Sequence, residues 1–135
     1  MLRSRWQTGR MNPPQQYSFE KLLVWQAARE LAKRVYLATA NFPQRELYGL
    51  TSQCNRAVIS VAANLAEGVS RHSRKEQAHF SEIAYGSLTE LACLLILAKD
   101  VGVLAADAEM NLRGSVEHVS VKLNALYRSQ RRRLD

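Results

Sequence analysis

The sequence predicts an all-α protein, an antiparallel up-and-down four-helix bundle. Its 135 residues suffice for one domain. Four stretches place apolar residues at helical spacing, and residues that cap or stop helices separate them. The chain has no sustained apolar-polar alternation, and no Asn-Gly or Asp-Gly pair to make a tight hairpin. Amphipathic helices joined by short connections are typical of such a bundle.

Charge and composition divide the chain into three parts. Residues 1–16 contain Gly, Pro and polar residues without an apolar period, so we expect a flexible basic N-terminal arm. Residues 17–127 should form the four-helix bundle, and residues 128–135 a basic C-terminal tail. The arm has three Arg and no acid, and the tail four Arg and one Asp, so together they carry +6 of the net charge of +7. Any basic surface should therefore lie mainly in these two segments.

The first two helices have recognisable ends. Ser18 is expected to cap the first helix, and Pro43 to stop it, because proline disfavours a helical conformation in the preceding residue. We expect the second helix to run from about residue 50 to residue 67 and to end at Gly68, which tolerates a left-handed conformation. The core stripe predicted for the first helix is Leu23, Ala27, Leu31 and Val35.

The third and fourth helices follow the clearest start signal in the chain. Ser73 and Glu76 form a capping-box pattern, and the helix can continue to Asp100, with Gly102 as its stop. Such a helix is about 40 Å long. A fourth helix should begin near Ala106 or Asp107. Its predicted core stripe is Met110, Val116, Val119, Leu123 and Leu126.

Residues 91–98 are apolar without exception, although a bundle helix should keep one face for water. The simplest cover for the outer face is another copy of the chain. The run is far shorter than the roughly 20 residues that span a bilayer, so we expect no membrane partner. The residues predicted at the oligomer interface are Leu91, Leu94, Leu95 and Ile96.

A line of polar residues follows one face of the second helix. Arg56, Ser60 and Asn64 recur every four residues, with Glu67 beside them. The line is either a recognition stripe for RNA or a protein, or a buried structural network. We favour the network, in which Arg56 pairs with Glu67 or with Glu90 and Asn64 fixes the helix packing.

Basic residues cluster at the turn before the third helix, where the helix dipole also favours an anion. A phosphate could be held there, and a solvated turn is the alternative. The nucleic-acid-binding residues predicted from this turn and the tail are Arg71, Arg74, Lys75, Arg128, Arg131, Arg132 and Arg133.

The sequence offers no catalytic or metal-binding constellation. Glu76 and His79 form a Glu-x-x-His half-motif, but the second copy that a di-iron site needs is missing. The chain lacks a nucleophile elbow and a Gly-rich phosphate loop. Cys54 and Cys93 are isolated in apolar stretches, as buried thiols of a cytoplasmic protein would be. We therefore expect a cytoplasmic, non-enzymatic protein without metal or cofactor.

Several short segments within residues 19–104 carry a family resemblance. They are Phe19, residues 22–25, Phe42 with Pro43, Glu46, residues 48–50, residues 64–68 and residues 86–91. In this order they resemble the four-helix-bundle family encoded within intervening sequences of bacterial 23S rRNA genes. The resemblance implies an all-helical, ring-shaped pentamer and names no reaction.

A bundle related to that family is the accessory variability protein of diversity-generating retroelements, which is linked to nucleic acid and a reverse transcriptase. The expected partners are therefore further copies of the chain and a nucleic acid, RNA or DNA, held weakly through its phosphates. The alternative function is a protein-protein interaction scaffold with no role in nucleic-acid binding.

Overall fold

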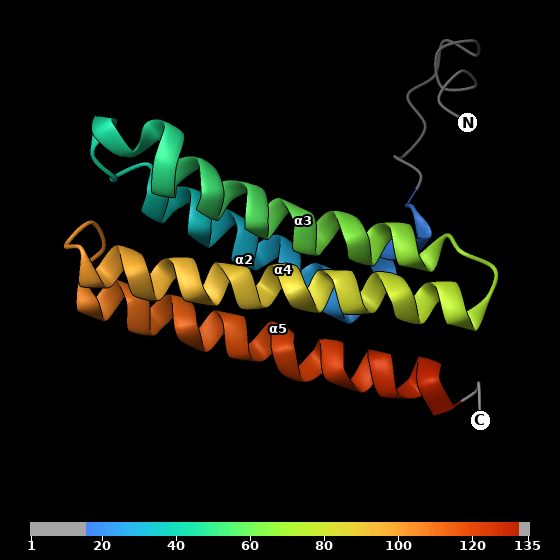
Figure 1. Ribbon diagram of the computed structural model, residues 1–135. Coiled ribbons are helices and arrows are strands. Elements are labelled where there is room, and N and C mark those ends of the chain that lie inside the picture. The colour runs from blue at the N-terminus through green and yellow to red at the C-terminus, as the bar shows by residue number, and fades with distance from the viewer. Residues whose placement is uncertain (1–15, 133–135) are drawn as a thin grey trace, which may run out of the picture.

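The computed structural model describes residues 16–132, and within them four long helices run antiparallel to their neighbours (Figure 1). They are α2 (Leu23–Thr39), α3 (Ser52–Val69), α4 (Arg74–Asp100) and α5 (Ala106–Arg132). Each helix packs against the next, and α5 packs back against α2, so the four enclose one core. No strand occurs among the described residues. The prediction of an all-helical protein with four helices is confirmed.

The chain enters the bundle through a 3₁₀ turn, η1 (Ser18–Lys21), so α2 begins later than predicted. Ser18 caps no α-helix, because the residue preceding α2 is Leu22, in an extended conformation with φ −76° and ψ 119°. The Phe19 ring packs edge-on against Trp25, with centroids 4.9 Å apart. This aromatic contact ties the entering turn to the first part of α2.

The core stripes predicted for α2 and α5 are confirmed in their later residues and wrong at their first ones. In α2, Leu31 and Val35 are buried as predicted. In α2 the buried residues include Val24 and Ala28, whereas Leu23 is 64% exposed. Successive steps of four residues overshoot a full helical turn by about 40° each, so a stripe drawn at that spacing drifts off the core. In α5, Val116, Val119 and Leu123 are buried as predicted, whereas Met110 is 62% exposed and Leu112 is buried instead.

Between α2 and α3 lie the 3₁₀ turn η2 (Gln44–Glu46) and one π-helical turn, η3 (Leu47–Thr51). The Glu46 carboxylate accepts a hydrogen bond from the Leu50 N–H at 3.2 Å and holds this turn. The prediction that the helix ends at Gly68 is wrong, because Gly68 lies buried within the last turn of α3. A Cβ at Gly68 would stand 3.0 Å from the Cβ of Phe80, so this glycine permits the close approach of α4.

The bounds of α4 agree with the prediction. The Glu76 N–H donates to Ser73 Oγ at 3.0 Å, and Gly102, with φ +80°, lies just beyond the helix end. With a mean hydropathy of 1.4 over its most apolar window, α4 is long and apolar enough to cross a membrane. Helices in the cores of soluble proteins share these properties, and here Leu88 and Leu91 are buried in the bundle core.

The predicted oligomer interface requires correction. Leu91, Leu94 and Leu95 are buried in the core of the bundle, at 0%, 7% and 1% exposure, while Ile96 is 38% exposed. The all-round apolar run arises because α4 packs against both α3 and α5, which cover more of its circumference than one core face. On the exposed side, Leu97 joins Ile96.

The two cysteines occupy different environments. Cys54 is fully buried, and burial raises the pKa of its thiol to about 11, so it stays neutral at physiological pH. Cys93 is exposed on α4, against the expectation that both thiols would be buried.

A polar contact does join α3 to α4. Ser60 and Asn64 belong to it as predicted, but the partner on α4 is Ser87 instead of Glu90. Ser60 Oγ and Ser87 Oγ lie 2.7 Å apart, and the Asn64 side chain donates to Ser60 O at 2.8 Å. Arg56 and Glu90 are exposed and form no ion pair with one another in the described part of the chain. Glu90 follows Ser87 by three residues, which turns it about 60° away from α3 and toward solvent.

We predict that Ser87→Ala, which removes the hydroxyl between α3 and α4, lowers the free energy of unfolding by about 1 kcal/mol, the usual net contribution of such a hydrogen bond. Arg56→Ala should change it by less than about 0.5 kcal/mol, as exposed substitutions usually do. Urea unfolding followed by circular dichroism measures both. A large loss for Arg56→Ala with none for Ser87→Ala would restore the network that the sequence predicted.

Candidate nucleic-acid interface

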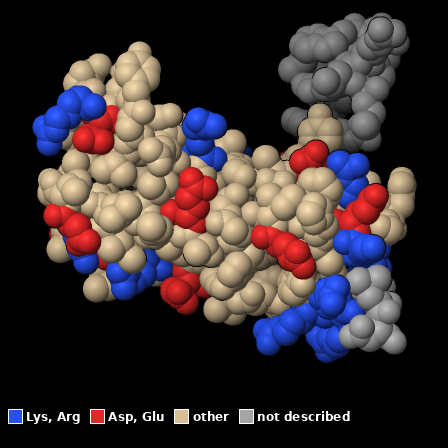
Figure 2. Space-filling view, viewed as in Figure 1, with Lys and Arg blue, Asp and Glu red and all other residues tan. Residues whose placement is uncertain are grey.

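The cations predicted to bind nucleic acid gather at one end of the bundle. The antiparallel order places the start of α4 and the last turns of α5 at this end, and Figure 2 shows Lys and Arg side chains crowded where α5 finishes. We call this cluster the basic end. Its members are Arg74, Lys75, Arg128, Arg131 and Arg132.

Hydrogen bonds between α4 and α5 fix the relative position of the two groups of cations. Ser81 Oγ donates to Gln130 Oε1 at 2.8 Å in a buried contact, and the Tyr127 hydroxyl donates to Glu82 Oε1 at 2.6 Å. Arg131 directly follows Gln130, and Arg74 precedes Ser81 by about 10 Å of helix. The structure therefore brings turn and tail cations together, although they are far apart in sequence.

The last turns of α5 include residues assigned to the tail. The helix continues to Arg132, so Arg128, Arg131 and Arg132 are helical, and Arg131 and Arg132 follow Arg128 by three and four residues. Arg133 and residues 1–15 of the predicted arm lie outside the described residues. The basic end is thus partly a helical surface rather than only a tail.

Arg71 differs from the other predicted cations, because it is committed to the α3–α4 turn. Its guanidinium lies 4.8 Å above the Phe80 ring and 3.4 Å from Glu67 Oε1. Its carbonyl oxygen accepts a hydrogen bond from the Gln77 side chain at 2.8 Å. Glu67 offsets part of its charge, so Arg71 also supports the turn, and its contact with a phosphate stays a prediction.

The five members of the basic end make no comparable contacts within the described residues. None of them forms an ion pair within residues 16–132, and all but the half-buried Arg74 are exposed. Exposed Lys and Arg side chains without partners are the groups that displace counterions from phosphates. The arrangement supplies phosphate contacts and shows no base-reading geometry.

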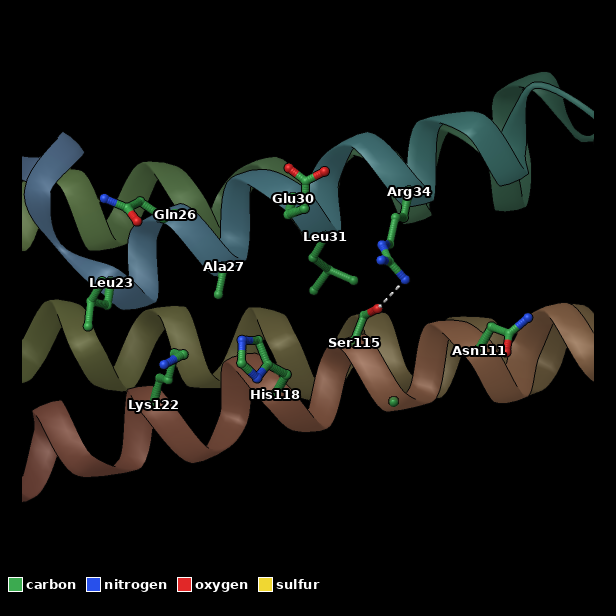
Figure 3. A pocket seen from close by; sticks show the side chains of 11 residues that line it. Leu23, Gln26, Ala27, Glu30, Leu31, Arg34, Asn111, Ser115, His118 and Lys122 are labelled. Atoms are coloured by element: carbon green, nitrogen blue, oxygen red, sulfur yellow. Dashed lines mark hydrogen bonds between the residues drawn. The ribbon is translucent and has the colours of Figure 1, made fainter.

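Two hollows on the sides of the bundle escaped prediction. A groove of about 560 Å³ between α2 and α3 has small residues such as Ala62 and Ala66 along it and Trp25, Tyr36 and Ile59 around it. A more polar cleft lies between α2 and α5 (Figure 3). Neither is visible in sequence, because each depends on which helices become neighbours.

A group of paired charges near the other end of the bundle is structural. Glu109 is buried, and its carboxylate accepts hydrogen bonds from Arg113 at 2.9 and 3.1 Å and lies 3.8 Å from Lys99 Nζ. The hydrogen bond from Arg113 to this carboxylate raises the pKa of the guanidinium. The four-residue spacing of Glu109 and Arg113 was the available sequence signal for the pair.

No metal-binding group of three or more His, Cys, Asp or Glu side chains occurs in the part of the chain that the structure describes. Glu76 and His79 therefore remain an isolated half-motif on α4. Glu76 contributes its backbone N–H to the Ser73 cap.

Comparison with known proteins places the chain in a family. A search of curated proteins found no match. Among solved structures, a protein of unknown function from the S23 ribosomal protein family of Bacteroides thetaiotaomicron superposes with a TM-score of 0.70 at 18% identity, covering 78% of this chain and 98% of that one. The sequence profile of the 23S rRNA-intervening sequence proteins matches residues 20–125, most of the chain. This protein therefore belongs to the 23S rRNA-intervening sequence protein family.

Proposed function

We propose that this protein is a non-enzymatic, cytoplasmic homo-oligomer that binds RNA weakly through phosphate contacts at the basic end. The observation that carries the proposal is the convergence of Arg74 and Lys75 with Arg128, Arg131 and Arg132 at one end of the bundle. Their side chains are free of ion pairs within the described residues, so they can pair with phosphates at little cost in broken contacts.

Oligomerisation would strengthen this weak binding. Each subunit presents five such cations among its described residues, but a ring presents the set once per subunit, and linked contacts to one RNA raise the overall affinity. The resemblance noted in the sequence implies five subunits. Repetition of the basic end around a ring is therefore part of the proposed function.

The groove between α2 and α3 supports self-association. Ile59 and Tyr36 on its walls are 49% and 45% exposed, and an apolar groove of this size costs free energy when left in water. The cations Arg29 and Lys33 line the groove as well, which suits a polar rim around an apolar centre. We propose the groove, rather than Leu91, Leu94 and Leu95, as a subunit contact.

The same groove is the observation that favours the alternative function, a scaffold for another protein. In that case the groove would accept a partner's apolar helix, and the basic end would serve solubility. RNA binding and its salt dependence separate the two functions, because a scaffold needs neither.

We predict that Arg74→Gln combined with Arg131→Gln weakens RNA binding and flattens its salt dependence. For a single strand, the slope of log affinity against log salt should fall by about 0.7 for each phosphate that the variant no longer neutralises. Fluorescence anisotropy with a labelled RNA across a salt series measures this.

The matched control is Arg45→Gln combined with Arg56→Gln, which removes the same charge from exposed positions away from the basic end. Equal weakening in both double variants would mean that net charge alone drives binding. An absence of RNA binding by the unaltered protein at low salt would leave the scaffold as the function.

We further predict that the protein in solution has the mass of several subunits and that Ile59→Lys lowers this mass. A lysine at this half-exposed position would place a charge in the apolar contact without disturbing the subunit core. Light scattering coupled to gel filtration gives the masses. Val121→Lys, at an exposed apolar site on α5, is the control. A monomeric unaltered protein at micromolar concentration would refute the oligomer.

A further inference from the structure

The cleft between α2 and α5 has a volume of about 570 Å³ and lies along the side of the bundle opposite the α3–α4 contact (Figure 3). Its size is in the range of small-molecule sites in proteins. Its lining combines basic, amide and apolar side chains, in contrast to the apolar α2–α3 groove. The function proposed for the basic end does not explain why this separate cleft carries such side chains.

Basic groups form a row along the cleft. Arg34 reaches from α2 toward α5 and donates from Nη1 to Ser115 Oγ at 3.2 Å, while His118 and Lys122 stand on successive turns of α5 (Figure 3). From Ser115 to Lys122 the row extends over about 10 Å of helix. A row of this length suits consecutive phosphates along a strand better than one compact anion.

The charge of the cleft is not cancelled by its carboxylate. Among the described residues that line the cleft, Glu30 is the one acid, and it lies 3.5 Å from Lys33 Nζ, in an ion pair within α2. Arg34 and Lys122 therefore contribute two positive charges to the cleft, whereas the negative charge of Glu30 is already paired with Lys33. The cleft therefore favours an anionic occupant.

The walls near this row can accept bases. Leu23, 64% exposed, and Ala27 present apolar surface, while Gln26 and Asn111 carry amides that can donate or accept hydrogen bonds. Gly114 leaves the cleft open, because a Cβ there would meet no atom within 4 Å. Single-stranded nucleic acid is commonly held by a positively charged groove beside surfaces on which its bases stack, usually aromatic rings; in this cleft the aliphatic side chains of Leu23 and Ala27 would provide that surface.

We propose that the α2–α5 cleft binds a short segment of single-stranded nucleic acid, with its phosphates along Arg34, His118 and Lys122 and its bases against Leu23 and Ala27. Lys122 is the member of the row nearest the C-terminal end of α5, so the strand continues from the cleft toward the basic end. This inference rests on the proposed function and adds to it the strandedness of the ligand and its path.

The test compares the full-length protein with two cleft variants, using a short oligouridylate and an RNA duplex as probes. Arg34→Gln combined with Lys122→Gln should lower affinity for the oligouridylate on the order of tenfold or more, since it removes two charge-assisted contacts. Gly114→Leu should do the same by filling the cleft, while the melting temperature holds or rises because leucine is the better helix former.

Two matched controls separate cleft binding from general effects. Gly86→Leu makes the same change at a mid-helix glycine of α4 whose Cβ would also meet no atom within 4 Å, and Arg45→Gln with Arg56→Gln removes the same charge. Both should bind the oligouridylate as the unaltered protein does. Duplex binding should respond to loss of the basic end and not to the cleft variants.

Failure of this inference is distinguishable from failure of the proposed function. If the cleft variants bind the oligouridylate unchanged while Arg74→Gln with Arg131→Gln weakens it, the cleft is not the path and the basic end stands. If the unaltered protein binds neither probe at low salt, both proposals are overturned.

Discussion

The burial of α4 is the constraint on which the rest of the structure depends. It packs against α3 on one side and α5 on the other, and Leu88, Leu91 and Leu95 are almost completely removed from water. Each such leucine contributes roughly 1.5–3 kcal/mol, so their register along α4 fixes where the neighbouring helices lie. The buried Ser81–Gln130 hydrogen bond follows from that register, and with it the meeting of the α3–α4 turn and the end of α5.

The sequence located the helices better than it oriented them. Ser73, Gly102 and Pro43 act locally, through capping, a left-handed backbone and a steric clash, so each could be recognised without the rest of the chain. Which side of a helix is buried depends on its neighbours. Leu23 and Met110 were therefore placed in the core by spacing, although they are exposed. The predicted pairing of Arg56 with Glu90 is wrong for the same reason. The position of a residue around its helix decides whether its side chain points to a neighbouring helix or to water, and both of these residues are exposed.

The rotation of α2 about its own axis also determines which of its residues line the groove toward α3 and which line the cleft toward α5. With Val24, Ala28 and Leu31 in the core, Trp25 and Tyr36 line the groove toward α3, and Leu23 lines the cleft toward α5. One flank is apolar enough to favour a protein surface, while the other mixes apolar and basic groups. The exposure of Leu23, a failure of the predicted stripe, is what gives the cleft apolar surface at that point.

The net charge of +7 says little about where an anion can bind, because cations differ in what they already contact. Arg113 pairs with the buried Glu109, and Arg71 with Glu67 and the Phe80 ring, so moving either to a phosphate would break a contact inside the fold. Breaking the pair at Glu109 would leave a buried carboxylate short of a partner, an expensive outcome. Arg74 and Arg131 carry no such commitment among the described residues, which is why position and partners, rather than the count of basic residues, select the basic end.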